Sequence, residues 1–566
     1  MKKVYLFMVS CGLAATIANA QATFQWGKAE GKWAYDYGYG IKTDNDGNVY
    51  VVGKYEEVGA AFSGSTVNCE GNHDAFLAKY NAAGDLQWVQ TMGGPDGDYS
   101  WAISTDKSSY LVVSGEIENK FHNSPNTISF SNSTITLASQ GDNDAFLAKY
   151  DLDGNLLWAI DEGHGVNSEK GLGNAIDANG NIYMCGYFTN ATVFNGTTYT
   201  GAGGRDIFVA KYNANGEFQW FRHAGSAGRD EAKAAVCDAN GNVYICGGFD
   251  DGCVFDGTTL NTWNNSDYWD AFIAKYDTNG DLQWVRRGGG DVDDMAWSIT
   301  IDNAGNLYTG GEMGAWAKFS TSQDDNNVFA IQAAGGADSY IAKYDQNGEI
   351  IWIRRGGSDK VDRIRGIGTD GTNIFATGQY SGTATFGNNS VVSVDTSDIF
   401  ITVISPEGNW GFVETVGGSV DAVELLGYES GNAVTGTASG EVYATGGLLN
   451  GGTFGTHSVS GYSRTDAFVT KLTWSGTVGL KDQTQYAAVK MYPNPATGLV
   501  QLDLSEIRSD KVEVFIYNNL GQKVCAQQCS GTSASIDLSD YSEGIYFLQM
   551  ESGTGKSAAQ KLIISR

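Results

Sequence analysis

Seven acidic side chains occupy one position of an internal repeat, a few residues ahead of a polar turn. They are Asp36, Asp98, Glu169, Asp230, Asp294, Asp362 and Asp421. If the repeats close into a ring, these carboxylates could line one mouth of a central channel and bind a hard cation such as Ca²⁺, which prefers several oxygen ligands. A short carboxylate that accepts backbone N–H groups in a repeated turn explains the same recurrence. We favour the turn interpretation, and no other cofactor is predicted.

The polar turns resemble the opening of a calcium loop but do not match its spacing. The segment from Asp177 to Asn181 reads Asp-Ala-Asn-Gly-Asn, with its glycine in fourth place and a strand pattern directly after it. An EF-hand loop has its glycine in sixth place and a bidentate Glu in twelfth place. These segments are therefore interpreted as β-hairpin turns.

Residues that could perform catalysis are few and do not repeat. The five histidines are scattered, and the sequence has neither an HExxH motif nor a G-x-S-x-G motif. Arginine pairs follow Trp284 and Trp352, where they could pair with neighbouring acids or bind an anionic ligand. No catalytic residue is assigned, and an enzymatic role is less favoured than a binding role.

Composition and charge indicate an all-β protein with a strongly acidic surface. The chain has 566 residues, of which 76 are glycine, 12% are aromatic and 18% are charged. Dense glycine with many aromatic residues is typical of short strands joined by tight turns. The formal net charge is −29. Because such a surface repels phosphate backbones, nucleic acid is not an expected partner, whereas cations are.

The first twenty residues have the order of a secretory signal peptide. Two lysines precede an apolar stretch, and Ala18-Asn19-Ala20 forms a small-residue cleavage site. We expect residues 1–20 to be removed and the mature chain to begin near Gln21. No later segment has the eighteen or more apolar residues of a membrane-spanning helix. Seven cysteines remain after cleavage without CxxC spacing, and we expect Cys185 and Cys246 to fill core positions.

Self-comparison of the chain reveals seven copies of one unit, 60 to 70 residues apart. Each copy contains a strand pattern of the type DAFLAKY, and ten residues after its aspartate stands a glycine. An aromatic residue follows four positions later in six copies, which indicates a hairpin turn of fixed length. Upstream, a second hairpin runs from the polar turn into a Tyr-x-x-Gly pattern or a close variant of it.

Four antiparallel strands in each of seven units predict a seven-bladed β-propeller over residues 21–480. The last unit lacks its fourth strand, because the pattern degenerates at Thr477 to Leu480. Residues Thr23 to Trp26 match the missing strand. We therefore predict that this N-terminal strand completes blade seven and removes an exposed sheet edge.

These repeats resemble the SBBP class of bacterial β-propeller repeats. The resemblance rests on the Gly-Gly turns, the D-x-x-G-N-x-Y-x-x-G hairpins and the D-A-F-x-x-K strands, and it covers roughly residues 23 to 480. The sixth unit departs from it, with Val403 and Ile404 in place of Lys-Tyr and Phe412 in place of Trp. The resemblance implies a propeller and no common reaction.

A different pattern begins after a polar linker at residues 481–490. Alternating strands over residues 491–566 predict a small Ig-like β-sandwich. This segment resembles the type A sorting domain of type IX secretion in Bacteroidetes, on the strength of the motif residues Tyr492, Pro493, Asn494, Pro495, Gly521, Gly544, Tyr546 and Lys561. The resemblance implies the type IX secretion machinery as a partner and passage through the periplasm to a secreted or surface-attached state.

Two classes of function stay open at this point. Sevenfold regularity favours a non-catalytic binding or adhesion module for glycan or protein, since a catalytic site requires broken symmetry. The segments Phe121 to Gln140 and Thr258 to Tyr268, rich in polar and aromatic residues, suit either ligand contact or ordinary surface loops. The alternative is a secreted hydrolase or lyase that acts on polysaccharide, because fold alone does not exclude catalysis.

Overall fold

The structure is a computed structural model, and it confirms the all-β class. It describes residues 21–475 and 491–565 except for 57, 120–126, 140, 165–166, 264–267, 321–327, 395, 418–428, 505–511, 519–522, 532, 553–554 and 557–559. The predicted signal peptide and linker thus lie outside the described residues. The chain divides into two compact domains, Met1–Val478 and Gly479–Arg566.

Within the described residues, the strand pairings of the first domain give seven four-stranded antiparallel sets, which we call repeats 1 to 7. Repeats 1 to 3 consist of β2 (Tyr37–Thr43), β3 (Val49–Tyr55), β6 (Asp74–Tyr80) and β7 (Leu86–Gly93); β8 (Asp98–Thr105), β9 (Tyr110–Glu118), β12 (Asn143–Asp151) and β13 (Leu156–Glu162); and β14 (Glu169–Ile176), β15 (Ile182–Phe194), β16 (Thr197–Tyr212) and β17 (Phe218–Gly225).

Repeats 4 to 7 have the same plan. They consist of β18 (Glu231–Cys237), β19 (Val243–Phe249), β22 (Asp270–Tyr276) and β23 (Leu282–Gly289); β24 (Met295–Ile301), β25 (Leu307–Met313), β28 (Asp338–Tyr344) and β29 (Ile350–Gly357); β30 (Arg363–Thr369), β31 (Ile374–Tyr380), β34 (Asp398–Ile404) and β35 (Trp410–Gly417); and β36 (Ser430–Gly436), β37 (Glu441–Phe454), β38 (His457–Ser475) and β1 (Gln21–Glu30).

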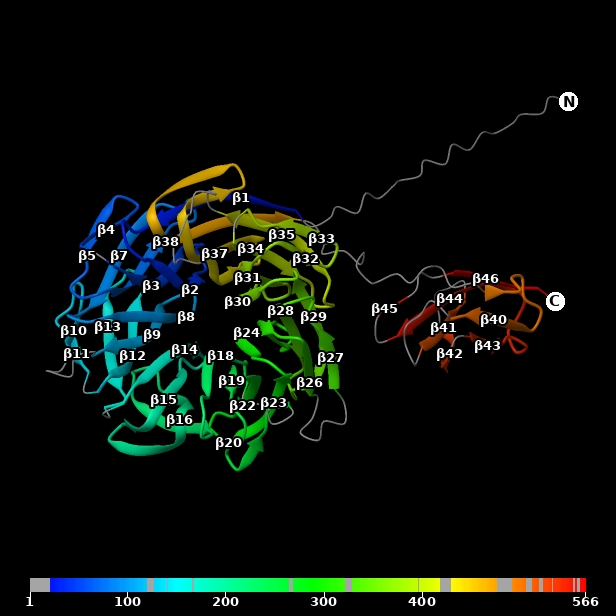
Figure 1. Ribbon diagram of the computed structural model, residues 1–566, viewed down its shortest axis with the longest axis horizontal. Coiled ribbons are helices and arrows are strands. Elements are labelled where there is room, and N and C mark those ends of the chain that lie inside the picture. Colours follow the sequence, from blue (N-terminus) through cyan, green and yellow to red (C-terminus); the bar gives the residue numbers. More distant parts are fainter. Residues whose placement is uncertain are drawn as a thin grey trace, which may run out of the picture. The chain divides into compact units, whose positions relative to one another are not determined.

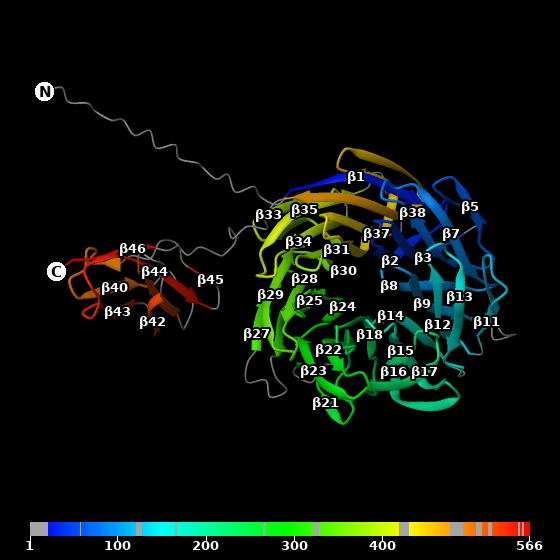
Figure 2. The ribbon, with the colours of Figure 1, turned by 180° about the vertical axis from the view of Figure 1, so that it is seen from behind.

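The first strand of each repeat faces the centre of a closed ring (Figure 1). Each of these inner strands contacts the inner strand of the next repeat, in the order β2, β8, β14, β18, β24, β30 and β36, and β36 contacts β2 again. The view from behind shows the same arrangement around the axis (Figure 2). The seven inner strands therefore form the wall of a central channel.

The strand β1 is the outer strand of repeat 7, although it comes first in the sequence. It pairs antiparallel with β38, so that Thr23 lies opposite Thr473 and Trp26 opposite Lys471. Phe24 is buried in the core cluster that contains Phe454 and Phe468. The segment assigned from sequence to the closing strand thus covers the edge of β38, which would otherwise present unpaired backbone groups.

Hairpins inserted between the second and third strands tie neighbouring repeats together. Four of them, β10–β11 (Thr127–Phe130, Thr136–Ala138), β20–β21 (Cys253–Phe255, Thr258–Leu260), β26–β27 (Trp316–Ser320, Val328–Gln332) and β32–β33 (Thr383–Phe386, Asn389–Val392), pair with the outer strand of the preceding repeat. A further hairpin joins β4 (Val58–Phe62) to β5 (Ser65–Asn68). The described parts of Phe121 to Gln140 and Thr258 to Tyr268 are thus partly used for packing, because Phe130 and Leu260 are buried core residues.

In every repeat but the sixth, a Lys of the repeat motif, together with a Trp, contacts the following repeat; we call this contact the clamp. The Lys149 ammonium donates to the Ala214 carbonyl at 2.8 Å, and Lys343 and the Trp352 indole both donate to the Pro406 carbonyl at 2.9 Å. Lys471 and Trp26 donate to the Ala82 carbonyl and extend this clamp across the ring closure.

Repeat 6 departs from the clamp for a topological reason. The acceptor carbonyl in other repeats belongs to the turn between the third and fourth strands of the following repeat. Repeat 7 has no such turn, since its fourth strand is β1. Val403 and Phe412 are accordingly buried, and Phe412 packs against Trp474 with ring centroids 6.4 Å apart.

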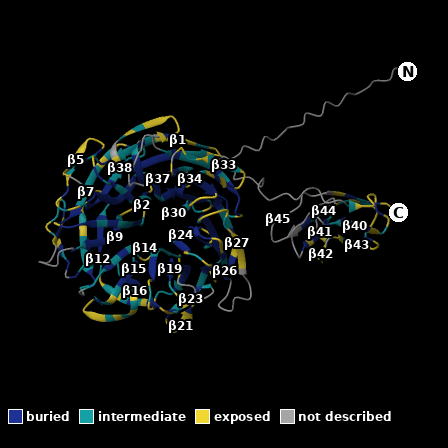
Figure 3. Ribbon diagram, in the orientation of Figure 1, coloured by how far each residue is buried: buried dark blue, intermediate teal, exposed yellow. Residues whose placement is uncertain are grey.

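Most strands of the repeats are buried, and exposure concentrates at turns and outer hairpins (Figure 3). Cys185 and Cys246 are buried in core clusters, as predicted for packing residues, and burial raises the pKa of both thiols. Among the described residues, no helix long and apolar enough to cross a bilayer is present.

The C-terminal domain has two antiparallel sheets that share one core cluster. One contains β39 (Met491–Tyr492), β40 (Leu499–Asp503) and β43 (Ser533–Asp537); the other contains β41 (Val512–Tyr517), β42 (Lys523–Cys529), β44 (Gly544–Ser552), β45 (Gly555–Lys556) and β46 (Gln560–Ile564). Asn494 of the YPNP motif fastens β46, because its amide donates to the Lys561 carbonyl at 2.7 Å and accepts from Ile563 N at 2.8 Å.

Candidate ligand-binding site

Five of the predicted acidic residues lie buried at the entry to their inner strands and accept hydrogen bonds from backbone N–H groups. Asp36 accepts from Lys32 N at 3.2 Å and from Glu56 N at 2.8 Å. Asp230 accepts in the same way from Ser226 N at 2.6 Å and Asp250 N at 3.0 Å. Each acid thus joins the turn before its strand to the end of the second strand. This geometry supports the turn interpretation over an ion-binding ring.

The other predicted members can be placed one by one. Asp98 accepts from Gly94 N, Asp294 from Gly314 N and Asp362 from Ser358 N, whereas Glu169 is fully buried between repeats 2 and 3. Asp421 lies outside the described residues. The equivalent bond in repeat 7 is made by Glu429, which accepts from Leu449 N at 3.3 Å. The buried acid of repeat 7 is therefore Glu429, eight residues after the predicted Asp421.

A second buried acid, the aspartate that opens each DAFLAKY strand, lies close to each of these acids. Burial raises the pKa of Asp36 to about 8, and Asp466 adds to the rise by like-charge repulsion. Burial likewise raises the pKa of Asp270 to about 7 and that of Asp74 to about 6. Burial therefore keeps these carboxyls protonated to a higher pH than a free aspartate.

The polar turns are hairpin turns whose aspartates are saturated by the turn itself. Asp177 accepts from Asn179 N at 2.8 Å, from Asn181 N at 2.9 Å and from the Asn181 amide at 2.8 Å. The Tyr183 hydroxyl adds a longer contact at 3.4 Å. No free carboxylate oxygen of Asp177 remains for a cation.

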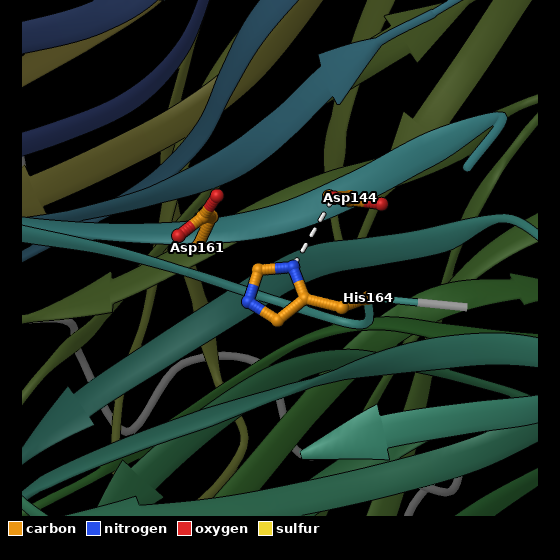
Figure 4. A group of neighbouring side chains, drawn as sticks. All are labelled: Asp144, Asp161 and His164. Carbon is orange, nitrogen blue, oxygen red and sulfur yellow. Dashed lines mark ion pairs between the residues drawn. The ribbon is translucent and has the colours of Figure 1, made fainter. Parts of the chain in front are cut away.

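One group of side chains has the composition of a metal site. Asp144, Asp161 and His164 offer ligand atoms within 4.8 Å of one another (Figure 4). His164 forms an ion pair with Asp144 at 3.7 Å, and this contact is the largest cause that raises its pKa. Asp161 accepts from Ala138 N at 3.2 Å. Because protein donors already engage these carboxylates, the group is explained as an ion pair within the packing of repeats 2 and 3.

A cavity at the mouth of the central channel is built by one residue from every repeat. The residue three places after each buried acid lines it: Tyr39, Trp101, Leu172, Lys233, Trp297, Arg365 and Asn432. The cavity has a volume of about 450 Å³ and continues into a narrower axial space of about 140 Å³ lined by the same seven residues.

A β-bulge aims each of these seven side chains at the channel. In repeat 2, Ser100 pairs with Gly115 and Ala102 with Ser114, so that Trp101 is the extra residue of the ladder. The same skip falls on Tyr39, Leu172, Lys233, Trp297, Arg365 and Asn432. Bulges re-aim a side chain and are frequent beside functional sites.

The glycine of the Tyr-x-x-Gly motif is what permits the bulge. A Cβ atom on Gly115 would collide with the Tyr99 carbonyl, and one on Gly311 would collide with the Met295 carbonyl. A glycine inside a strand pattern is a known sign of a bulge or of close backbone approach. This glycine therefore indicates a bulge in every repeat, whereas the Tyr-x-x-Gly pattern alone predicts only a strand.

Aromatic rings line the cavity at two places, Tyr39 with Trp101 and, among the cations, Trp297. Tyr39 lies 4.4 Å from Trp101 between ring centroids, and Tyr99 stacks on Trp101 at 4.7 Å with an interplanar angle of 7°. The Trp101 indole donates to Glu116 at 3.3 Å, and that of Trp297 donates to Glu312 at 3.1 Å. These bonds fix the ring orientations and give the cavity rigid aromatic walls.

Cationic side chains also line the cavity. Lys170 pairs with Glu116 at 2.7 Å, whereas Lys233 and Arg205 both pair with Glu231. Burial opposes ionisation of Glu231, but Lys233 and Arg205 overcome it and hold the pKa of Glu231 below its ordinary value. Arg365 lies over the Trp297 ring at 5.1 Å, and its Nε atom has no hydrogen-bond partner among the described residues.

Family models match two parts of the chain. The model for a secretion system C-terminal sorting domain matches residues 490–565, and the model for a β-propeller repeat matches residues 25–54. The chain therefore carries the SBBP β-propeller repeat and the type IX sorting domain that the sequence motifs indicate. It is a secreted or cell-surface β-propeller protein exported by type IX secretion, whose sorting domain implies interaction with that machinery.

The motif residues of the sorting domain are placed as follows. Tyr492, Pro493, Asn494 and Pro495 are exposed, as is Lys561, while Gly544 and Tyr546 lie in β44. Gly521 lies outside the described residues. The exposed motif is held by Asn494 against β46, so that the family pattern has a structural basis in this chain.

Curated relatives match short stretches of the chain. A regulatory protein FlaEY of Caulobacter vibrioides is 24% identical over 216 residues, 37% of this chain and 22% of that protein. An uncharacterized WD repeat-containing protein of Acanthamoeba polyphaga mimivirus is 24% identical over 36% of this chain and 16% of that protein. An ulvan lyase of Nonlabens ulvanivorans is 32% identical over 85 residues, 15% of this chain and 16% of that enzyme. The chain thus spans less than a quarter of each relative's length.

Two solved structures match the chain at low sequence identity. A fungal alcohol oxidase of the AA5 family in complex with copper is 12% identical, with 81% of this chain and 95% of that chain covered and a TM-score of 0.26. PorZ, a surface component of the type IX secretion system of Porphyromonas gingivalis, is 10% identical, with 95% and 100% covered and a TM-score of 0.15. At these TM-scores the likeness carries no argument.

Proposed function

We propose that this protein is a non-catalytic binding module that takes the end of an extracellular ligand, a glycan or a protein segment, into the channel mouth. Export to the outside of the cell places the propeller among such ligands. The cavity volume lies within the range of small-ligand sites, about 300–1,000 Å³. A chain end fits such a cavity, whereas a folded protein surface requires a broad contact area of about 800 Å².

The observation that carries the proposal is a cavity whose wall varies between repeats. Because a catalytic site would show such variation too, the state of the carboxylates beside the cavity separates binding from catalysis. The buried acids, the hairpin turns and the Lys and Trp clamps recur nearly unchanged around the ring. At the bulge position the residues instead are aromatic, aliphatic, cationic and amide side chains. A position that serves only packing in a repeated environment has no need of this variety, whereas recognition of an asymmetric ligand does.

The carboxylates beside the cavity favour binding over hydrolysis. Glycoside hydrolysis requires two carboxyl groups, one of them protonated as a general acid. Glu231 is paired with two cations, and its pKa is lowered rather than raised. Glu116 is occupied by Trp101, Lys170 and Asn143. These engagements support a binding role, and the polysaccharide hydrolase or lyase is retained as the alternative that the experiment addresses.

The test measures capture and turnover with the full chain. Glycan and peptide arrays identify a ligand, whose affinity is then compared for Trp101→Ala, Trp297→Ala and the control Trp33→Ala. Trp33 is 57% exposed and does not line the cavity. We expect loss of at least about tenfold in affinity for the two channel variants, equivalent to about 1.4 kcal/mol, and no loss for the control. Release of cleaved product would support the enzymatic alternative, and equal affinity of all variants would contradict a site in the channel.

A further inference from the structure

We infer that the ligand of the channel mouth is the end of an acidic glycan, with a carboxylate or sulfate group held by Lys42, Lys233 and Arg365 and sugar rings placed against Trp101 and Tyr39. This inference rests on the proposed binding function and names the chemical class of the ligand.

The charge of the channel is opposite to that of the protein as a whole. The chain has a formal net charge of −29. Among the described residues that line the mouth cavity are four cations, Lys170, Arg205, Lys233 and Arg365, and one carboxylate, Glu231. The narrower axial space is lined by three cations, Lys42, Lys233 and Arg365, and its described lining contains no carboxylate.

The other end of the molecule gives the contrast. A cavity beside the polar turns is lined by Asp44, Asp46, Asp370 and Glu441, with Lys107 as its cation. An anionic group is therefore repelled there and attracted to the mouth lined by Arg365. Low-dielectric walls focus this attraction and raise the local concentration of anions.

The cationic side chains in the narrow part of the channel are not fully paired with carboxylates. Lys233 shares Glu231 with Arg205 and lies over the Trp297 ring at 4.9 Å, while Arg365 lies over the same ring at 5.1 Å. Among the described residues Arg365 forms no ion pair, and its Nε atom is buried and unbonded. Burying a charge without a counter-ion is costly, so an anion bound here relieves a penalty that the free protein carries.

The pKa directions agree with this geometry. Burial lowers the pKa of Lys42, and neighbouring Lys107 lowers it further. Burial also lowers the pKa of Arg365, and Arg363 adds to this effect. A bound carboxylate or sulfate would act in the opposite direction on both side chains.

The walls favour a sugar over the other anionic ligands. Tyr39 and Trp101 line the mouth with rings of fixed orientation that suit the C–H face of a sugar ring, and the cations over Trp297 would address its acidic substituent. The planar guanidinium of Arg365 suits a carboxylate or a sulfate equally, because both offer two oxygens side by side.

The experiment compares three trimers by calorimetry on the full chain: galacturonic acid, sulfated galactose and neutral galactose. We expect one or both acidic trimers to bind at least about tenfold more tightly than the neutral one and to weaken from 50 to 200 mM salt. Selectivity for the first assigns a carboxylate ligand, and selectivity for the second assigns a sulfate. Arg365→Gln should reduce the affinity for the acidic trimer about tenfold, equivalent to about 1.4 kcal/mol, and Arg365→Lys should retain most of it.

Arg222→Gln is the matched control, since Arg222 lies over Trp220 at 5.5 Å on an outer strand away from the cavity. Lys42→Met provides a second variant if Arg365→Gln fails to fold. Equal binding of neutral and acidic trimers, unaffected by Arg365→Gln but lost in Trp101→Ala, would overturn the acidic class and leave the binding function intact. Tighter binding of a glutamate hexapeptide than of any trimer would overturn the sugar class. Failure of every ligand to depend on Trp101 would overturn the proposed function itself.

Discussion

The frame of the propeller and the wall of its channel follow opposite rules, although they lie within three residues of each other. The buried acid at the start of each inner strand is Asp or Glu in every repeat. In repeats 1, 2, 4, 5, 6 and 7 it accepts a hydrogen bond from a backbone N–H group. Three residues later the side chain ranges from Trp to Asn. Repetition thus marks what the ring requires for closure, and variation marks what the ligand requires.

The bulge connects these two rules in one strand. It is common to all seven inner strands and depends on the glycine opposite to it. The side chain that it turns toward the axis differs between repeats, although it contacts the side chains beside it, as Tyr39 contacts Trp101 and Arg365 contacts Trp297. A symmetric backbone device therefore presents an asymmetric surface.

The largest expected effect comes from breaking the frame at its closure. Deletion of residues 21–30 removes β1, which covers the edge of β38 and buries Phe24, and which links repeat 7 to repeat 1 through Trp26. We expect aggregation, or a loss of at least about 4 kcal/mol in the free energy of unfolding, since an open edge and a core cavity combine. Thermal unfolding and light scattering measure it, and an unchanged melting temperature would contradict the closing role of β1.

A glycine opposite a bulge should have the next largest effect. In Gly115→Ala the new Cβ meets the Tyr99 carbonyl and the Phe146 ring, so the bulge at Trp101 must shift. We expect a loss of about 2–3 kcal/mol, as for other overpacked core positions, together with weaker ligand binding. Denaturant unfolding measures the first and calorimetry the second.

Gly498→Ala is the control for this change, because nothing lies within 4 Å of the position its Cβ would take. It should leave the propeller transition unchanged. A Gly115→Ala protein with wild-type stability and wild-type binding would show that the bulge does not require glycine.

The sequence allowed the frame to be predicted because the frame repeats. The strand patterns, the polar turns and the placement of Thr23 to Trp26 as an outer strand all came from comparing the chain with itself. The same comparison misplaced the seventh acid. The turn of repeat 7 begins with Thr437, where the other turns begin with an acid. The nearest acid before it is Glu429, and the spacing of eight residues from that acid indicates Asp421.

The channel wall could not be found in this way, because its residues share a position and not a residue type. Trp101, Lys233 and Arg365 have nothing in common in the sequence until the bulge places them around one axis. For the acids, which do share a type, the sequence favours a role in the turn over a place at the mouth of the channel. Asp36 bonds to the turn before it and to the end of the second strand, because a buried carboxylate finds its nearest donors there.

The smallest expected effect comes from the protonation of the frame. The raised pKa values of Asp36, Asp270 and Asp74, to about 8, 7 and 6, mean that the folded state binds protons more tightly than the unfolded chain, whose aspartates titrate near 4. The stability from these groups is therefore complete below about pH 4 and is lost as the pH rises through 6 to 8. The melting temperature should therefore fall between pH 5 and pH 9.

Asp36→Asn separates this effect from the general repulsion of an acidic protein. The Asn oxygen still accepts one backbone N–H and does not ionise, so the decrease between pH 5 and pH 9 should become smaller. Asp281→Asn removes an equal charge at a side chain that is 69% exposed and should leave the decrease as it is. An identical pH profile for both variants would assign the pH dependence to net charge and would contradict a contribution from the buried carboxyls. A smaller decrease in Asp36→Asn alone would assign the pH dependence to the buried, protonated carboxyl of Asp36, which joins the turn at Lys32 to the end of β3 at Glu56.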